Sequence, residues 1–293
     1  MVRSVKAASH GIAAGLLSLA LLHTSGCAWL DTRQRELIYR PTPAQPSAAS
    51  NLKPGDQHYQ VKLSDQADAE HLAFWWLPNP QPNAPTLLYL HGTFRNLYGN
   101  QRKIESLRSA GFSVLAVDYR GWGESSPRIP SEQSILQDAN IAWQEFTKRQ
   151  PNPAQRVVYG HSMGSGVAVD LSSQLNYPRD YGGLVLESAF TSFDGVAREA
   201  GWLARVLNWF NRERFDSAAK IKRIQAPLLM LHGKLDDTIP IVLGERLFAT
   251  ANAPKRWVAI EGAAHSDLDL VDPSLYQSSL RDFAAAYLVT PTK

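Results

Sequence analysis

The chain has 293 residues, of which 44% are hydrophobic, and this is enough for one sizeable core in one or two domains. Its 30 basic and 27 acidic residues leave a net charge of +3, without a cluster of lysine and arginine, so the charge gives no support to nucleic-acid binding. The single cysteine, Cys27, and the lack of a His/Cys cluster give no sign of a zinc site, and we expect neither metal nor cofactor.

The first 26 residues have the pattern of an export signal. Two basic residues precede an uncharged apolar run over 12–22, which suits a signal peptide and is short for a transmembrane helix. Small residues then precede Cys27, as in the cleavage box of bacterial lipoproteins. We predict a lipoprotein-type signal peptide over 1–26, a lipidated Cys27 and a location in the bacterial envelope, anchored to a membrane and facing the periplasm. An ordinary cleaved signal and an uncleaved anchor are the alternatives.

Residues 41–50 are rich in proline, alanine and serine, which is typical of an extended linker. We therefore predict a linker arm over 27–54 and one globular domain over 55–290. Short apolar runs and longer amphipathic stretches alternate within that domain. The predicted strands are 58–63, 71–77, 86–90, 113–117, 157–159, 183–186, 227–231 and 256–260. The predicted helices are 97–110, 131–149, 163–175, 241–251 and 273–287.

This alternation predicts an α/β fold, with a mainly parallel central sheet and helices on both faces. The first two strands read as a hairpin. Because ligands bind beyond the carboxyl ends of the strands in such sheets, the residues that follow strands are the candidates for a functional site.

The sequence Gly160-His161-Ser162-Met163-Gly164 lies between a predicted strand and a predicted helix. Gly-x-Ser-x-Gly at such a corner is typical of a nucleophile elbow, in which the glycines relieve crowding and the serine oxygen projects from the turn. The free N–H groups at the start of the helix favour negative charge. The alternative is a Gly/Ser-rich turn without chemistry.

Two further strand ends supply partners for Ser162. Asp236 follows strand 227–231, and His265 lies in a small-residue loop after strand 256–260. A neutral histidine can accept the serine proton, and a carboxylate can hold its tautomer and stabilise the charged ring. The order Ser162, Asp236, His265 is that of α/β-hydrolase triads. We predict these three as the catalytic residues.

Other residues of the same types are open as alternatives. Asp237 adjoins Asp236 and could be the acid; otherwise it caps the next turn. Glu187, after another strand, could also be the acid, and otherwise braces loops near the site. Three histidines that likewise sit at strand ends are interpreted as hydrogen-bonding residues of tight turns: His91, His161 and His232.

The segment His91-Gly92-Thr93 follows strand 86–90. A glycine there lets the backbone turn so that the next N–H faces the serine. We predict that the backbone N–H groups of Thr93 and Met163 form an oxyanion hole, and the alternative is an ordinary turn.

Several ordered segments together resemble the α/β-hydrolase superfamily, and within it the Bem46-like group, whose signature overlaps that of the S33 serine aminopeptidase-type hydrolases. The resemblance runs from about residue 58 to 288. It is carried by Leu90-His91-Gly92, Asp118 to Ser125, Gly160 to Gly164, Glu187 to Ser192, His232 to Asp236 with Ile239-Pro240, and Gly262 to His265. It implies the α/β-hydrolase fold and the triad roles of Ser162, Asp236 and His265.

Two departures from the family pattern concern the loops around the site. Thr93-Phe94-Arg95-Asn96 stands where the family often has Asn-Ala-Gly-Asn, and this affects the geometry of the oxyanion loop. Trp122 stands where tyrosine or phenylalanine is common, which we interpret as a mild packing change. Asp118 follows strand 113–117, and we interpret it as a structural residue that fixes the turn over 120–123.

A tryptophan-rich apolar stretch, 201–210, lies between strands 183–186 and 227–231. In related hydrolases an insertion here forms a small cap that shapes the acyl pocket, so we predict a small helical cap insertion over about 191–218. The alternatives are an ordinary core helix and a membrane-contacting face.

Together these features predict a serine hydrolase that cleaves carboxylic esters through an acyl-enzyme. Its partners would be a small-molecule or lipid-like ester and a membrane, reached through lipidated Cys27, and no nucleic acid. A thioesterase, amidase or peptidase could use the same residues, and an acyltransferase or a non-catalytic envelope protein are further alternatives. The sequence leaves the natural substrate and the oligomeric state open.

Overall fold

A computed structural model describes residues 29–43, 53–209 and 211–288. The predicted signal peptide over 1–26 and Cys27 lie outside these residues, so export and lipidation stay predictions. Within the described ranges, we find no helix with both the length and the apolar character that crossing a membrane requires.

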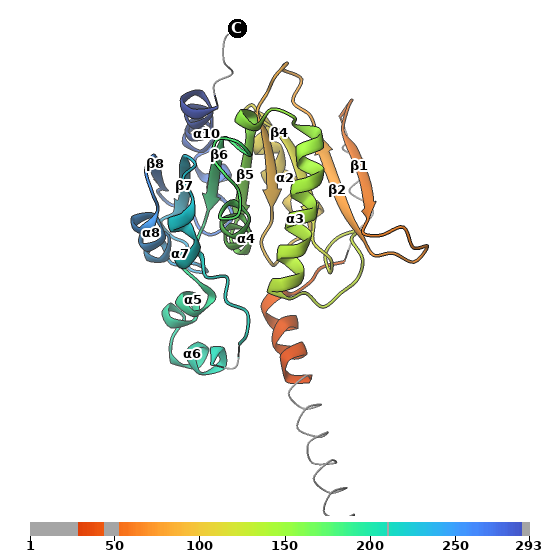
Figure 1. The fold of residues 1–293 in the computed structure, drawn as a ribbon. Helices are drawn as coiled ribbons and strands as arrows, with labels where there is room; N and C mark the ends of the chain where they lie inside the picture. Colours follow the sequence, from red (N-terminus) through yellow and green to blue (C-terminus); the bar gives the residue numbers. More distant parts are fainter. Residues whose placement is uncertain (1–28, 44–52, 210, 289–293) are drawn as a thin grey trace, which may run out of the picture.

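An eight-stranded sheet forms the centre of the molecule (Figure 1). Its strands follow the order β1-β2-β4-β3-β5-β6-β7-β8. β1 pairs antiparallel with β2 and β2 with β4, whereas every other pairing is parallel, so the predicted hairpin and mainly parallel sheet are confirmed. The strands are β1 (Gln57–Lys62), β2 (His71–Leu77), β3 (Thr86–Leu90), β4 (Ser113–Asp118), β5 (Arg156–His161), β6 (Gly183–Glu187), β7 (Leu228–Gly233) and β8 (Lys255–Ile260).

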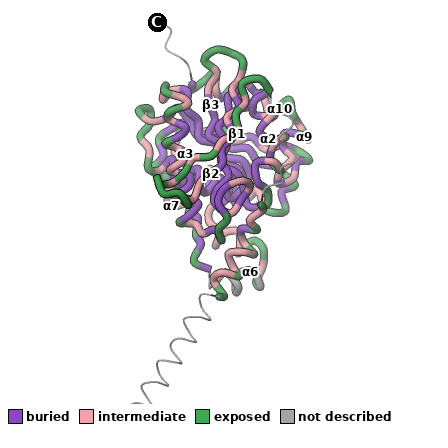
Figure 2. The backbone as a smooth tube through the Cα atoms, turned by 90° about the vertical axis from the view of Figure 1, so that its right-hand side faces the viewer, coloured by how far each residue is buried: buried purple, intermediate pink, exposed green. Residues whose placement is uncertain are grey.

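Helices cover both faces of this sheet. The longer ones are α2 (Leu97–Ser109), α3 (Glu132–Arg149), α4 (Met163–Ser172), α8 (Ile241–Thr250) and α10 (Pro273–Tyr287). Shorter elements are α7 (Ser217–Lys220), α9 (Leu268–Val271), η2 (Pro153–Gln155) and η3 (Ile221–Arg223). Side chains of β3 alternate between two cores: Leu88 and Leu90 pack with α3 and α4, while Leu87 and Tyr89 pack with α2 and α10. The buried backbone accordingly lies in the middle of the molecule (Figure 2).

Capping side chains set the helix ends close to where the sequence predicts them. Asn96 accepts the Gly99 N–H at the start of α2, and Asp272 does the same for Leu275 at the start of α10. Ser131 and Ser134 form a capping box before α3. Each of these side chains satisfies a backbone group that the first helical turn leaves free.

Part of the predicted linker arm over 27–54 is helical instead, and this corrects the prediction. Residues 29–39 form a helix that ends at the fully buried Tyr39. The Tyr39 hydroxyl donates to the carboxylate of Glu213, which also pairs with Arg35 at 3.2 Å. The proline-rich composition of 41–50 does not extend to this helix, which is anchored on the main core by Tyr39 and Ile38.

The predicted cap insertion contains two short helices between β6 and β7. α5 (Phe193–Glu199) and α6 (Trp202–Asn208) extend beyond the sheet, at the same end of the molecule as the helix over 29–39 (Figure 1). Trp202 and Trp209 are 76% and 84% exposed, so α6 is not an ordinary core helix. The membrane-contact alternative stays a prediction.

Candidate active site

The carboxyl ends of the parallel strands are aligned at one edge of the sheet. Leu90 of β3 lies opposite Gly160 of β5, and His161 of β5 lies opposite Glu187 of β6. At the ends of β7 and β8, Gly233 pairs with Ile260. The predicted site residues, which follow these strands, are therefore brought together from distant parts of the chain.

Ser162 occupies a strained turn between β5 and α4, with φ 55° and ψ −125°. Its two flanking glycines are required by close backbone contacts. A Cβ added to Gly160 would lie 2.2 Å from the carbonyl oxygen of Gly164, and one added to Gly164 would lie 2.0 Å from that of Leu90. The sharp turn predicted from the Gly-x-Ser-x-Gly sequence is therefore present.

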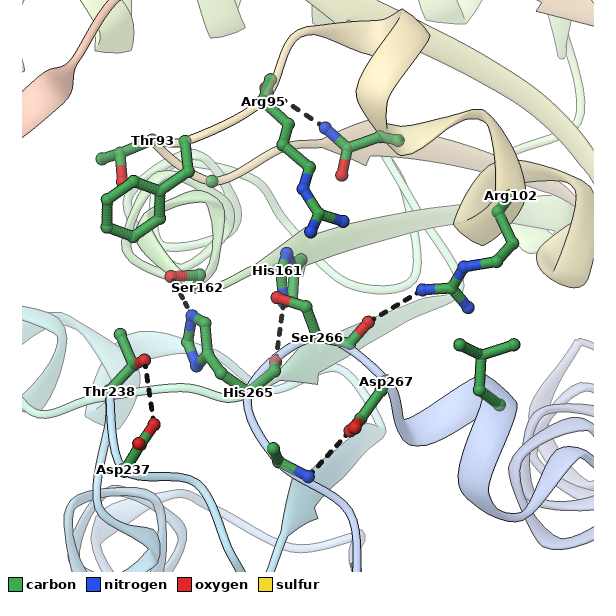
Figure 3. Close-up of a pocket in the computed structure, with 15 residues that line it drawn as sticks. Thr93, Arg95, Arg102, His161, Ser162, Asp237, Thr238, His265, Ser266 and Asp267 are labelled. Carbon is green, nitrogen blue, oxygen red and sulfur yellow. Dashed lines mark hydrogen bonds between the residues drawn. The ribbon is translucent and has the colours of Figure 1, made fainter.

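Ser162, His265 and Asp236 form a continuous row of hydrogen bonds. His265 Nδ1 lies 2.8 Å from Asp236 Oδ2. On the other side of the ring, His265 Nε2 lies 2.8 Å from Ser162 Oγ (Figure 3). Because a carboxylate can only accept, Nδ1 carries the proton and donates it to Asp236. Nε2 is then the acceptor for the serine hydroxyl, which is the arrangement that a general base requires.

The Asp236 carboxylate is held in its ionised form. Burial alone would raise its pKa, but hydrogen bonds with His232 and His265, together with the Ile239 N–H, hold the pKa well below its ordinary value. Its Oδ1 accepts the N–H groups of Thr238 at 3.0 Å and Ile239 at 2.8 Å. Asp236 itself thus caps this turn, and the expectation that Asp237 would do so is wrong.

Glu187 is in contact with other partners and not with the ring of His265. Its carboxylate accepts from Lys103 at 2.5 Å, from Tyr276 at 3.0 Å and from Tyr159. Lys103 also pairs with Asp269 at 2.8 Å. This buried cluster lies under the loop that carries His265, so the geometry fits the bracing interpretation of Glu187 and not its alternative as the acid.

Three side chains hold the backbone around His265. His161 Nε2 donates to the carbonyl of His265 at 3.1 Å, and the hydroxyl of Ser188 donates to the same oxygen at 3.0 Å. Arg102 donates to the next carbonyl, that of Ser266, at 3.0 Å. The sequence pattern gave His161 only a role within its own turn and assigned none to Ser188 or Arg102, because these contacts join distant segments.

The buried pair of His161 and Glu187 predicts a loss of stability in acid. Burial lowers the pKa of His161 from 6.5 to about 4, although the charge of Glu187 opposes this. For Glu187, burial would raise the pKa, but the charges of Lys103 and His161 lower it from 4.5 to about 2. In both cases the unfolded chain binds its proton at a higher pH than the folded protein, so the stabilisation is complete above about pH 6.5 and is lost as the pH falls.

We expect His161→Gln to flatten the upper part of this dependence, between about pH 6.5 and 4. Glutamine can still donate to the His265 carbonyl but does not titrate. The lowered pKa of His161 contributes on the order of 3 kcal/mol to the pH dependence of the free energy of unfolding, because one pKa unit corresponds to about 1.4 kcal/mol. The variant should lack this contribution. Urea unfolding of both proteins at several pH values measures it, and parallel curves for the two proteins would contradict the prediction.

The loop that follows β3 lies against the nucleophile. A Cβ added to Gly92 would lie 3.0 Å from the Cβ of Ser162, so only glycine permits this approach. The next N–H, that of Thr93, has no acceptor among the described residues. Met163 is the first residue of α4, where N–H groups have no partner within the helix. Neither predicted oxyanion donor thus has a backbone acceptor among the described residues, and Thr93 and Met163 line the same cavity as Ser162.

Trp122 holds this loop in place. Its indole N–H donates to the Thr93 carbonyl at 2.8 Å, and its side chain is fully buried between His91 and Tyr119. The sequence marked Trp122 as a departure from the family pattern but assigned it only a mild packing effect. The structure corrects this, because the indole supplies a hydrogen bond that phenylalanine cannot make.

We expect Trp122→Phe to lower kcat by about 10-fold while KM changes little, because the oxyanion donor would lose its restraint but the cavities would remain. Steady-state kinetics with a p-nitrophenyl ester measures this. Trp143→Phe, which changes a tryptophan remote from this loop, is the control, and an equal fall in both variants would contradict the prediction.

Asp118 and His91 form a buried support below the same loop. Asp118 Oδ1 accepts the Leu97 N–H at 3.0 Å and lies 3.3 Å from His91 Nε2. A Cβ on Gly123 would overlap the Asp118 carboxylate, so the carboxylate packs directly on the following turn. Burial raises the pKa of Asp118, with His91 opposing. The structural interpretation of Asp118 agrees with these contacts.

Two cavities meet at Ser162. One, of about 500 Å³, is mostly apolar and is formed by the helix over 29–39, α5 and α6. Its apolar lining includes Leu30, Leu37, Phe190, Phe193, Val196 and Ile239. The other, of about 560 Å³, is lined mostly by polar and charged residues, and we call it the polar cavity (Figure 3). Ser162 and Thr93 line both, whereas His265 lines only the polar cavity.

No three histidine, cysteine or acidic side chains within the described part of the chain are placed to hold a metal ion.

Comparison with known proteins identifies the family. The model of the S33 serine aminopeptidase family of hydrolases matches residues 81–218, which include Ser162 but neither Asp236 nor His265. An uncharacterised protein of Mycobacterium tuberculosis is 33% identical over 269 residues, which cover 90% of this chain and 92% of that protein. The lysophosphatidylserine lipase ABHD12 of Danio rerio is 34% identical over 200 residues, which cover 62% of this chain and 51% of that protein.

An esterase of Pyrococcus furiosus has a similar fold, with a TM-score of 0.65 and 19% identity, over 85% of this chain and 98% of that one. The chain spans about half the length of the ABHD12 relative and nearly the whole of the esterase. This protein belongs to the α/β-hydrolase superfamily, and its fold is that of the esterases in this superfamily.

Proposed function

We propose that this protein is a serine hydrolase that cleaves carboxylic esters through an acyl-enzyme. The observation that carries the proposal is the row of hydrogen bonds from Ser162 through His265 to Asp236, next to two open backbone N–H groups. A hydroxyl on a strained turn, an imidazole that it bonds and a buried, ionised carboxylate behind the ring are the groups that nucleophilic catalysis by serine requires.

In this mechanism Ser162 Oγ attacks the ester carbonyl while its proton passes to His265 Nε2. The N–H groups of Thr93 and Met163 hold the oxyanion, and Asp236 stabilises the imidazolium. His265 then gives the proton to the leaving alcohol as the C–O bond breaks. Water enters, loses its proton to His265, and releases the acid from Ser162 by the same sequence of steps.

The two cavities support one orientation of the ester. The leaving oxygen must face His265, which lines only the polar cavity, so the alcohol lies there and the acyl chain extends into the apolar cavity. An apolar cavity of about 500 Å³ suits a lipid-like acyl chain. The likeness to a protein named as a lysophosphatidylserine lipase supports the same class of substrate.

Labelling with a fluorophosphonate probe tests the nucleophile. The unmodified protein should label, Ser162→Ala should not, and Ser165→Ala should label as the unmodified protein does. Ser165 is a suitable control because it lies one turn further along α4 and its buried hydroxyl has no hydrogen-bond partner in the described residues. Equal labelling of Ser162→Ala would remove the assignment.

The same residues could cleave thioesters or amides, which remain the alternative. A panel of p-nitrophenyl esters, acyl thioesters and aminoacyl amides separates the three. We expect the esters with longer acyl chains to be the best substrates, because the acyl cavity is mostly apolar and its described lining has no carboxylate to pair with an amino terminus.

A further inference from the structure

The helix over 29–39 forms one wall of the apolar cavity that meets Ser162. Its lining residues have the spacing of a single helix face: Leu30, Arg33, Gln34, Leu37 and Ile38. Residues of α5 with the same kind of spacing supply another wall: Phe193, Val196 and Ala197. The cavity is therefore a cleft between two helices that extend beyond the sheet, and Ser162 lies at its inner end.

The base of this helix is fastened to the body of the molecule. Tyr39 is fully buried and donates its hydroxyl to Glu213, and Ile38 packs against the main core. Arg35 pairs with Glu213 at 3.2 Å and with Asp31, one turn earlier, at 2.9 Å. The wall is thus built into the fold. A wall held in this way loses little freedom when a ligand binds against it.

Residues 40–43 join the base of the helix to the loop after β3, which carries one of the proposed oxyanion donors. The side-chain amide of Asn96 in this loop donates to the Pro43 carbonyl at 3.1 Å. The guanidinium of Arg40 lies 5.1 Å from the ring centre of Phe94, which is also in this loop. These contacts place the base of the helix beside the reacting end of the cleft.

The rest of the helix extends away from the body of the molecule (Figure 1). Leu37 is close to the base, whereas Leu30 lies seven residues nearer the outer end, about 10 Å further out by the rise of an α-helix. An acyl chain on Ser162 that follows the cleft would therefore reach Leu37 first and Leu30 only when it is long.

We propose that the helix over 29–39 sets the acyl-chain selectivity of this protein, with medium chains in contact with Leu37 and only long chains in contact with Leu30. The proposal rests on the proposed ester hydrolysis and on the orientation in which the acyl chain enters the apolar cavity. Each methylene buried against such side chains contributes a factor of about 4. The match to the family model begins at residue 81, so this helix lies outside it.

Three p-nitrophenyl esters test the proposal: butanoate, octanoate and dodecanoate, each below its aggregation concentration. We expect Leu37→Asp to lower the ratio of kcat/KM for octanoate to that for butanoate by about 10-fold, because a methylene chain is disfavoured beside a carboxylate. Leu30→Asp should lower the dodecanoate-to-butanoate ratio to a similar extent, and the octanoate-to-butanoate ratio much less. Leu37 and Leu30 are 72% and 51% exposed, so both variants should fold.

Two further variants are the controls. Leu37→Met keeps an apolar side chain and should retain the ratios of the unmodified protein. Ile129→Asp places the same charge at an exposed apolar residue that lines neither cavity, and it should also leave both ratios unchanged. Ratios in Leu37→Asp that equal those of Ile129→Asp overturn the proposal, as does an equal effect of the two leucine variants on both ratios.

The outcomes separate this proposal from the proposed function. If the unmodified protein labels with the fluorophosphonate and hydrolyses the esters, but the leucine variants leave the ratios unaltered, only the role of the helix fails. If the unmodified protein neither labels nor hydrolyses any of the esters, the proposed function fails, and the acyl wall fails with it.

Discussion

Asp236→Asn should lower kcat by about 10³ to 10⁴ while the protein stays folded. The two backbone N–H groups of Thr238 and Ile239 already bind Asp236 Oδ1, and the asparagine oxygen would keep both bonds. The asparagine NH₂ would then face His265 Nδ1 and could only donate to it. His265 would carry its proton on Nε2, which would leave no acceptor for the hydroxyl of Ser162. Steady-state hydrolysis of a p-nitrophenyl ester measures kcat, and circular dichroism checks the fold.

Asp237→Asn is the matched control for this experiment. Its carboxylate is exposed and bonds only the Thr238 hydroxyl, so we expect kcat to change less than about 3-fold, as for a surface substitution. Should Asp237→Asn cost as much activity as Asp236→Asn, or Asp236→Asn retain most of it, the assignment of the acid is wrong. Glu187→Gln adds no test of the acid, because it also disturbs the buried cluster with Lys103.

Local patterns in the sequence predicted the sheet and the position of the site. The apolar runs of β3, β4 and β7 are buried on both faces, so they stand out as unbroken stretches. The starts of α2 and α3 could likewise be predicted, because Asn96 and Ser131 each accept a backbone N–H three residues further along the chain. Since parallel strands end at a common edge, residues after those strands had to converge, and Ser162, Asp236 and His265 do so.

The contacts that support the site were not predictable, because they join distant segments with no pattern in common. Tyr39 meets Glu213 174 residues further along, and Lys103 meets Glu187 across 84 residues. A buried lysine within a helix also looks like any exposed one in the sequence. The apolar cavity depends on the helix over 29–39, which the prediction treated as linker, so its shape could not be derived either. Three supports did carry a signal: Glu187 and Asp118 by their places after strands, and Trp122 as a departure from the family pattern.

Lys103→Met should destabilise the folded state by about 3 to 5 kcal/mol, the range found when one partner of a buried ion pair is removed. The side chains of Lys103, Glu187 and Asp269 are 4%, 0% and 2% exposed, so water cannot replace the lost ammonium. Burial would raise the pKa of Glu187, and it is chiefly the charge of Lys103 that lowers it to about 2. Without that charge, Glu187 should take up a proton at a higher pH. Urea unfolding at neutral pH measures the loss of stability.

The double variant Lys103→Met/Glu187→Gln separates the charge effect from the loss of packing. Lys103→Met leaves the Glu187 carboxylate unpaired, and the second substitution removes that carboxylate. Asp269 keeps Arg102 as its partner, so the double variant should be more stable than Lys103→Met alone. Lys148→Met removes an exposed lysine paired with Glu145 and should change stability by less than about 0.5 kcal/mol. If Lys103→Met is as harmless as this control, the cluster does not hold the His265 loop. Asp269 lies four residues after His265. If the cluster does hold the His265 loop, Lys103→Met should therefore lower kcat as well as the free energy of unfolding.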